Sequence, residues 1–374
     1  MGLRDSIGPG NFSEFDDDGV SQSREVNQAN EITDITGGWI TPSYDRAGNM
    51  ISGPKPGSET NRIHMIYDAW NRLVKVQADD SGDPGEVISQ YEYNGTNRRI
   101  EKVVTEEGGG PTHVHYYYNH EWQMLEEQFV DNEGALLADN QYVWSLRYID
   151  APIVRFHDGN GDGDYEDAGD NVLYYTTDAN HNVTGLVGLV ETSPEVYEWQ
   201  VVERYVYDPY GKATVYDEDW SNTTSPTTDG PLYCGYWFDA ETGLYQVRNR
   251  YYNSSLATFI SRDPIQADIN PYRYCGNDPT NKTDPSGEKW WSPSDWWEWA
   301  KSWFTSCDPS SGSGGLDCAA EICKTENMIN YPLWRRNHEE EGSAEWKYWN
   351  GVYQNALKQS QKPTCPSPPN KCKK

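Results

Sequence analysis

The sequence predicts a mainly β protein that consists of a long curling sheet, a tightly folded plug and a small helical tail. Three observations lead to this prediction. The chain has 27 Tyr and 16 Trp among 33 Gly and many Asn and Asp residues, which is typical of strands joined by frequent turns. A tyrosine-centred unit recurs along the first half of the chain. Three Asp-Pro steps crowd one later stretch, and the composition changes abruptly after it.

The recurrent unit occupies much of residues 1–216. The tyrosines that mark it are 23, 24 and 25 residues apart: Tyr44, Tyr67, Tyr91 and Tyr116. In each unit a strand ends at tyrosine, a turn of Asp, Asn or Gly follows, and a second strand starts at an aliphatic residue such as Leu73. One hairpin cannot bury its own face, whereas hairpins stacked side by side can. We therefore expect a long curling sheet, interrupted by a polar loop at residues 220–231.

An acidic insertion breaks the repeat at residues 158–170, DGNGDGDYEDAGD. Oxygen-bearing side chains alternate in it, and a glycine in the sixth place permits the sharp turn of a Ca²⁺ loop. The twelfth place, where such a loop has Glu, is Gly169, and the flanking segments resemble strands. Two interpretations stay open, an acidic hairpin loop and a Ca²⁺ site in which Glu166, Asp167 or Asp170 closes the ligand set. The Ca²⁺ ligands of the second are Asp158, Asn160, Asp162, Asp164 and Glu166.

Residues 217–287 form the expected plug. The motif FDAETGLYQVRNRYY indicates a turn at Asp239–Gly243, followed by a strand in which Arg248 and Arg250 interrupt the apolar residues. Each Asp-Pro step that follows breaks regular structure, because proline fixes its own φ and restricts the residue before it. So many breaks in a short stretch predict a compact unit that carries carboxylates on rigid bends.

Three motifs here resemble the core domain associated with Rhs (YD) repeats, found in Rhs polymorphic toxins, Tc toxin C components and teneurins. They are YDPYGKA at 207–213, GYWFDAETGLYQVRNRYYNSSLATFISRDP at 235–264 and NPYRYCGNDPTNKTDPSG at 270–287. The recurrent units resemble the YD repeat, whose family fold is a spiralling β-sheet that can close into a hollow shell. Because family shells contain far more repeats, the resemblance implies a partial shell that ends in a core plug. We interpret the chain as a C-terminal fragment, a truncated paralogue or one piece of a split gene, which an upstream Rhs repeat segment would complete.

The resemblance also implies a self-cutting site. In similar Rhs and Tc C proteins the core cuts its own chain just after the DPxG motif, using the Asp of an RDP motif and the Asp of DPxG as a protease-like pair. By this correspondence Asp263 and Asp284 are the catalytic candidates, Arg262 holds one carboxylate, and the cut follows Glu288. Two close carboxyl groups do not both ionise easily, so one stays protonated while the other acts as base for water. Family members usually have an aliphatic residue in place of Glu288, and the alternative is that both aspartates only cap turns.

The composition changes at residue 288, where a variable tail, 288–374, begins. Six tryptophans lie within WWSPSDWWEWAKSWF, Ser294 can cap a helix there, and a second helix is predicted over 343–361. The family resemblance does not extend into the tail. Five of the seven cysteines lie in it without metal-ligand spacing, and disulfides and free thiols are both compatible with them. The tryptophans either pack on the sheet or form a membrane-interface or carbohydrate-binding surface.

Charge and hydropathy exclude some functions. A net charge of −29 argues against a nucleic-acid-binding surface for the chain as a whole. No stretch approaches the length of a transmembrane segment, and the first residues lack the apolar run of a signal peptide. The leading hypothesis is the C-terminal shell and core of a polymorphic toxin or surface Rhs system, secreted or at the cell surface, with aspartate-dependent autoproteolysis as its only enzymatic activity. The alternatives are a non-enzymatic module that binds cell-surface carbohydrate, and a tail that is itself a toxin domain with an immunity protein as partner.

Overall fold

A computed structural model describes residues 11–15, 21–105, 110–146, 148–163, 165, 169–193, 196–224 and 229–290. The chain divides into two compact units, Met1–Ser292 and Pro293–Lys374, and the described residues all belong to the first. Within these ranges the helical elements are two 3₁₀ turns, η1 (Tyr233–Gly235) and η2 (Cys275–Asn277), and no helix is long and apolar enough to cross a membrane. The prediction of a mainly β fold is confirmed. The predicted helices of the tail lie outside the described residues.

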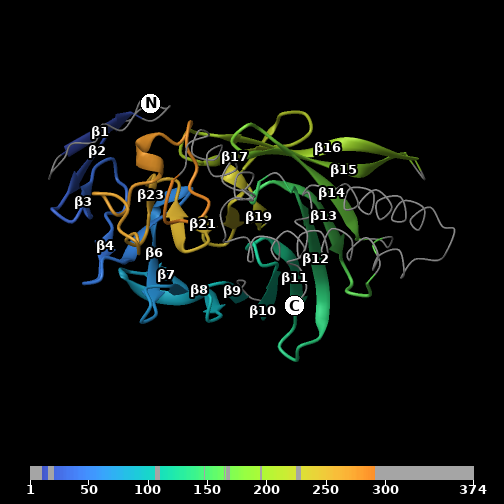
Figure 1. Ribbon diagram of the computed structural model, residues 1–374, viewed down its shortest axis with the longest axis horizontal. Helices are drawn as coiled ribbons and strands as arrows, with labels where there is room; N and C mark the ends of the chain where they lie inside the picture. The colour runs from blue at the N-terminus through green and yellow to red at the C-terminus, as the bar shows by residue number, and fades with distance from the viewer. Residues whose placement is uncertain are drawn as a thin grey trace, which may run out of the picture. The chain divides into compact units, whose positions relative to one another are not determined.

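Fifteen strands form one open antiparallel sheet in which every strand pairs with its neighbours in sequence (Figure 1). The strand β18 lies inside the stretch that was predicted to be a polar loop, so that prediction was wrong for residues 222–224. The bounds are β4 (Ser43–Tyr44), β5 (Met50–Lys55), β6 (Ser58–Tyr67), β7 (Leu73–Asp80), β8 (Asp83–Tyr93), β9 (Arg99–Thr105), β10 (Pro111–Tyr118), β11 (Met124–Val130), β12 (Leu136–Trp144), β13 (Pro152–Asp158), β14 (Asn171–Thr177), β15 (Val183–Ser193), β16 (Val196–Tyr207), β17 (Ala213–Tyr216) and β18 (Asn222–Thr224).

One kind of turn recurs along this sheet. An Asp or Asn follows the strand, and its side-chain oxygen accepts hydrogen bonds from the backbone N–H groups two and four residues later. Asp68 Oδ1, for example, accepts from Trp70 at 2.9 Å and from Arg72 at 3.0 Å, while Asn71 takes a φ of 62°. Asn, Asp and Gly suit this turn because they tolerate positive φ or bond their own backbone. The same pair of hydrogen bonds is found at Asn94, Asn119, Asp131, Asp178, Asp208 and Asp217.

In the third and fourth units, the tyrosine that ends the strand lies two residues after the one that the spacing selected. The strands there end at Tyr93 and Tyr118, whereas the spacing selected Tyr91 and Tyr116. Side chains two apart on a strand point to the same face, so both members of each pair fit the alternation. The unit is therefore defined by the Asp or Asn whose side chain closes the turn, and not by the position of the tyrosine.

Two smaller sheets complete the described unit. The first sheet joins the plug strands in the order β19-β20-β21-β22-β23, and the second joins β1-β2-β3. The predicted turn at Asp239–Gly243 is present, but the strand expected after it is a tight hairpin in which Val247 pairs with Arg250. The bounds are β1 (Asn11–Phe15), β2 (Ser21–Val26), β3 (Ile32–Ile35), β19 (Gly230–Pro231), β20 (Trp237–Asp239), β21 (Leu244–Val247), β22 (Arg250–Asn253) and β23 (Thr258–Phe259).

The plug contacts the large sheet near both ends and in its middle. One apolar cluster joins plug residues to β5–β8, a second joins Trp237 to β10–β12, and a third joins the plug to β15–β17. A flat sheet of fifteen strands would be roughly 65 Å wide, far more than five short strands can reach. The sheet must therefore curve around the plug, and the hydrophobic core lies between them.

Candidate functional site

The turn between β21 and β22 lies against the segment Asp284–Lys289, which contains the DPSG motif. The two residues of the turn and the first residue of β22 donate hydrogen bonds to three consecutive carbonyl oxygens of the segment: Arg248 to Pro285, Asn249 to Ser286, and Arg250 to Gly287. We call these three donors the carbonyl clamp. The approach of the two chains is close, because a Cβ added to Gly287 would lie 2.2 Å from the carbonyl oxygen of Val247.

Side chains from distant parts of the chain brace the carbonyl clamp. Asp150 accepts two hydrogen bonds from the Arg248 guanidinium, at 2.5 and 3.1 Å. Asn97 donates to the side chain of Asn249 at 2.7 Å. Arg250 is buried with its guanidinium 3.6 Å from the centre of the Phe259 ring. The clamp is thus held between turns of the large sheet and the interior of the plug.

Asp284 lies at the start of the clamped segment and is 2% exposed. Its Oδ1 accepts from the backbone N–H groups of Glu288 and Lys289, each at 3.1 Å, and its Oδ2 lies 3.5 Å from the guanidinium of Arg250. Burial raises the pKa of Asp284 and outweighs Arg250 and the two N–H groups, which act to lower it. The Lys289 nitrogen is the leaving atom of a cut after Glu288. Asp284 therefore contacts the bond that the sequence singled out.

Asp263 is buried as well, at 4% exposed, and its carboxylate caps a turn. Oδ1 accepts from the N–H of Ile265 at 3.0 Å and Oδ2 from that of Ala267 at 2.8 Å, as the turn-capping alternative requires. Within the described ranges no hydrogen bond joins Asp263 to Asp284. Both nevertheless act on Glu288, whose pKa is raised by burial, then by Asp263 and also by Asp284, against the opposing effect of Arg250.

The expected role of Arg262 was wrong. Its guanidinium forms an ion pair with Glu31 at 3.0 Å and donates to the Tyr272 hydroxyl at 3.3 Å. Neighbouring residues of an extended chain point to opposite sides, so the burial of Asp263 turns Arg262 outward. The arginine that approaches a candidate catalytic carboxyl group is Arg250, and no sequence pattern distinguished it from its neighbour Arg248.

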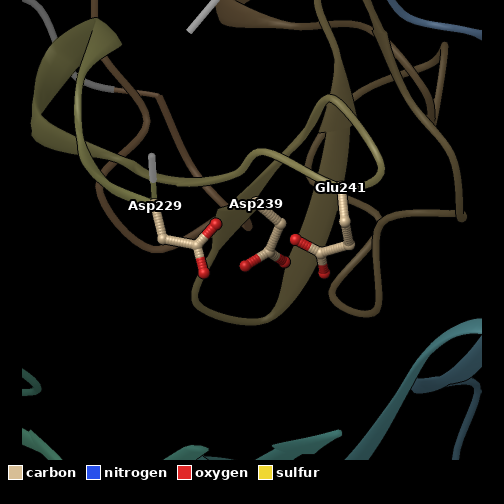
Figure 2. A group of neighbouring side chains, drawn as sticks. All are labelled: Asp229, Asp239 and Glu241. Atoms are coloured by element: carbon tan, nitrogen blue, oxygen red, sulfur yellow. The ribbon is translucent and has the colours of Figure 1, made fainter. Parts of the chain in front are cut away.

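A second group of acidic side chains lies on the plug where it meets β9. Figure 2 shows Asp229, Asp239 and Glu241 side by side, and among the described residues they are the one group of three or more His, Cys, Asp or Glu side chains whose ligand atoms all lie within 4.8 Å of one another. The ammonium of Lys102 contacts all three, and Arg99 donates to Asp239 at 2.6 and 2.9 Å. Lysine thus occupies the place that a metal ion would take. We call these three acids, Arg99 and Lys102 the ion cluster, and we infer that it holds the large sheet and the plug together.

Three of the five predicted Ca²⁺ ligands are described, and Asp164 and Glu166 lie outside the described residues. Burial acts to raise the pKa of Asp158, but hydrogen bonds from backbone N–H groups of the loop, led by that of Gly163 at 2.7 Å, lower it overall. In the described part of the loop, neither Asp158 nor Asp162 belongs to a converging trio of His, Cys, Asp or Glu side chains. The backbone of residues 160–163 thus folds around the Asp158 carboxylate, and the Ca²⁺ site stays a prediction.

No family model matches the chain. Among curated proteins, it is 26% identical over 283 residues to the tRNA nuclease WapA of Bacillus subtilis (strain 168), 26% over 263 residues to the toxin protein Tse5 of Pseudomonas aeruginosa, and 23% over 265 residues to the salivary gland surface protein 1 of Aedes aegypti. These matches cover 73%, 65% and 66% of this chain but only 10%, 18% and 7% of the relatives. The chain therefore spans a small part of the length of the proteins it resembles.

Among solved structures, the Photorhabdus luminescens Tc holotoxin pore with an aspartate-to-alanine mutation in TccC3 shares the fold. The match has a TM-score of 0.51 at 18% identity, and it covers 74% of this chain and 13% of that chain. The curved sheet with its plug is thus a fold that also occurs in a large toxin assembly.

Proposed function

We propose that this chain is the C-terminal shell and core of an Rhs-type toxin system, and that the core cuts its own chain after Glu288 to release the tail. The observation that carries this proposal is the 3.1 Å contact between Asp284 Oδ1 and the backbone nitrogen of Lys289. The similarity to proteins named as a nuclease and a toxin, and the fold shared with a Tc toxin chain, support it.

The proposed reaction is hydrolysis of the peptide bond between Glu288 and Lys289. Asp263 acts as base and takes a proton from water, whose oxygen bonds to the carbonyl carbon of Glu288. Each carboxylate oxygen has a second lone pair, so its turn-capping hydrogen bonds leave Asp263 able to do this. Asp284, whose pKa is raised by burial, acts as the acid and gives its proton to the Lys289 nitrogen as the C–N bond breaks. One water is consumed, and the products are a carboxyl terminus at 288 and an amine at 289.

We expect the purified wild-type chain to separate into two fragments that meet after Glu288, and the Asp263→Asn and Asp284→Asn chains to remain whole. Asparagine keeps the shape of aspartate but neither takes nor gives the required proton. Because the acid must be protonated, a rise in pH through the raised pKa of Asp284 removes its proton, so cutting should be faster near pH 5 than near pH 8. Intact mass against time measures both effects.

Asp131→Asn is the matched control, because Asn94 and Asn119 already fill the same place in equivalent turns. It should cut at the wild-type rate. A wild-type chain that stays whole at both pH values would overturn the protease assignment. The alternative of a non-enzymatic carbohydrate-binding module would then stand, with the exposed rings of Tyr174, Tyr197 and Trp199 as its contact surface.

The proposal includes an upstream partner and a location. Among the described strands, β4 pairs only with β5 and β18 only with β17, so each leaves one edge of the large sheet open. Open strand edges are templates for further strands, which suits completion of the shell by an upstream repeat segment. A released tail acts where it is delivered, so we place the protein outside the producing cell or on its surface, and a tail with toxic activity requires an immunity protein.

We also propose that the acidic loop binds Ca²⁺ through Asp158, Asn160, Asp162, Asp164 and Glu166. All five supply oxygen, the donor that Ca²⁺ prefers. Asp139 faces Asp158 across β12 and β13, and its pKa is raised to about 6 by burial, then by Glu126 and Asp158, so negative charge already accumulates beside the loop.

We expect about 1 mM Ca²⁺ to raise the Tm of the full chain by about 2–10 °C, because a ligand that binds only the folded state stabilises it. Differential scanning calorimetry measures the shift. Asp162→Asn, which alters one ligand and spares the structural Asp158, should remove most of it, whereas Asp217→Asn in a distant turn should not. The same Tm with and without Ca²⁺ would show that the loop is an acidic hairpin only.

A further inference from the structure

We propose that the carbonyl clamp positions the cleavage segment for the cut and holds the new carboxyl terminus of the core afterwards. This inference rests on the proposed self-cleavage. The clamp residues and the carbonyl groups they hold follow one another in the same order, each pair separated by 37 residues: Arg248 with Pro285, Asn249 with Ser286 and Arg250 with Gly287. A ladder of this kind fixes both the position and the direction of the segment.

All three held carbonyl groups lie upstream of the proposed cut. Hydrolysis between Glu288 and Lys289 therefore breaks none of the clamp's hydrogen bonds. The cut adds a carboxylate at residue 288, beside Asp263, Asp284 and the side chain of Glu288. Arg250 is the cation that interacts with all three of these acids, so it is placed to balance the added charge. The core can keep its end in place after the tail is separated.

Two of the braces of the clamp come from the large sheet. Asp150 follows β12 and holds the guanidinium of Arg248, and Asn97 precedes β9 and holds the side chain of Asn249. The segment is consequently aligned with the clamp donors only when these turns of the sheet have formed. The clamp thus makes cutting wait until the sheet has folded around the plug, which would prevent premature loss of the tail.

The test compares cutting rates by intact mass in full-length chains. Arg248→Met combined with Asp150→Asn removes one clamp donor without leaving an unpaired buried carboxylate, and it should slow cutting roughly tenfold or more. Arg248→Lys, which keeps a charged donor, should restore part of the rate. Met65→Ala, a core change in the large sheet, lowers stability without touching the segment and should cut at the wild-type rate.

A second measurement separates the clamp from the chemistry. In the Asp263→Asn background, which is expected not to cut, backbone amide hydrogen exchange of residues 284–289 should become roughly tenfold faster or more when Arg248→Met and Asp150→Asn are added, with exchange elsewhere unchanged. An uncut wild-type chain would overturn self-cleavage and the positioning role with it. A cut wild-type chain whose Arg248→Met, Asp150→Asn variant cuts equally fast would overturn the clamp alone, whatever the exchange shows.

Discussion

Replacing Lys102 by methionine is expected to lower the free energy of unfolding by about 3–5 kcal/mol, the usual cost of removing one partner from a buried ion pair. Lys102 is 1% exposed, and its ammonium contacts Asp229, Asp239 and Glu241. Methionine fills a similar volume but leaves Asp239 paired with Arg99 alone and takes the ammonium away from Asp229 and Glu241. Chemical denaturation of the full chain, followed by tryptophan fluorescence, measures the loss.

The charges of this ion cluster predict how the decrease in the free energy of unfolding caused by Lys102→Met depends on pH. Burial raises the pKa of Glu241 to about 7 despite the opposing effect of Lys102, whereas Arg99 and Lys102 together overcome burial and lower the pKa of Asp239. Without Lys102, Asp239 and Glu241 lose a group that lowers their pKa values, so these two acids bind protons more readily in the folded state. An acid with a raised folded pKa costs stability as pH rises. The variant should therefore be less destabilised near pH 5 than near pH 8.

Lys75→Met on β7 is the matched control, because this half-buried lysine forms no ion pair with the residues that the structure describes. Lys75→Met should change the free energy of unfolding by no more than about 0.5 kcal/mol. If Lys102→Met costs less than about 1 kcal/mol at both pH values, the cluster does not join the sheet to the plug and the assignment fails.

The sequence predicted those features that depend on neighbours in the chain. An Asp or Asn followed by a residue with positive φ closes a turn through its own side chain, so the recurrent hairpins could be recognised without a structure. Asp284 and Lys289 are five residues apart, and the DPSG motif located both. In each case the contact is local, and the residue types alone limit the conformations available.

Long-range pairings could not be predicted in this way. Arg99 meets Asp239 across 140 residues, and no local pattern indicates that two strands so far apart will meet. The hairpin at Arg248 was missed because its two arginines resemble the outward positions of one strand, while Arg248 in fact takes a φ of 46°. Arg262 was predicted to hold a carboxylate because it belongs to the RDP motif, although alternation along the chain separates its side chain from that of Asp263.

Gly287→Ala is expected to decrease the rate of cutting by about 100-fold or more, as follows when a reacting group is displaced by about 1 Å. Gly287 has a φ of 69°, which costs alanine about 1 kcal/mol. The larger effect is steric, since the new Cβ would lie 2.2 Å from the Val247 oxygen and 3.2 Å from the Arg250 nitrogen. Both are backbone atoms of the hairpin, so neither can move aside cheaply.

Gly134→Ala separates these two contributions, because Gly134 has a φ of 83° but no atom within 4 Å of the added Cβ. Gly134→Ala should lower the free energy of unfolding by about 1 kcal/mol and leave the cutting rate unchanged. Gly287→Ala should lower the free energy of unfolding by about 2–4 kcal/mol or release the segment from the carbonyl clamp. The difference in cutting rate between the two variants isolates the close approach of segment and hairpin. Should Gly287→Ala cut within about threefold of the wild type, the segment reacts without lying against the hairpin, and Asp284 loses the contact on which its catalytic role depends.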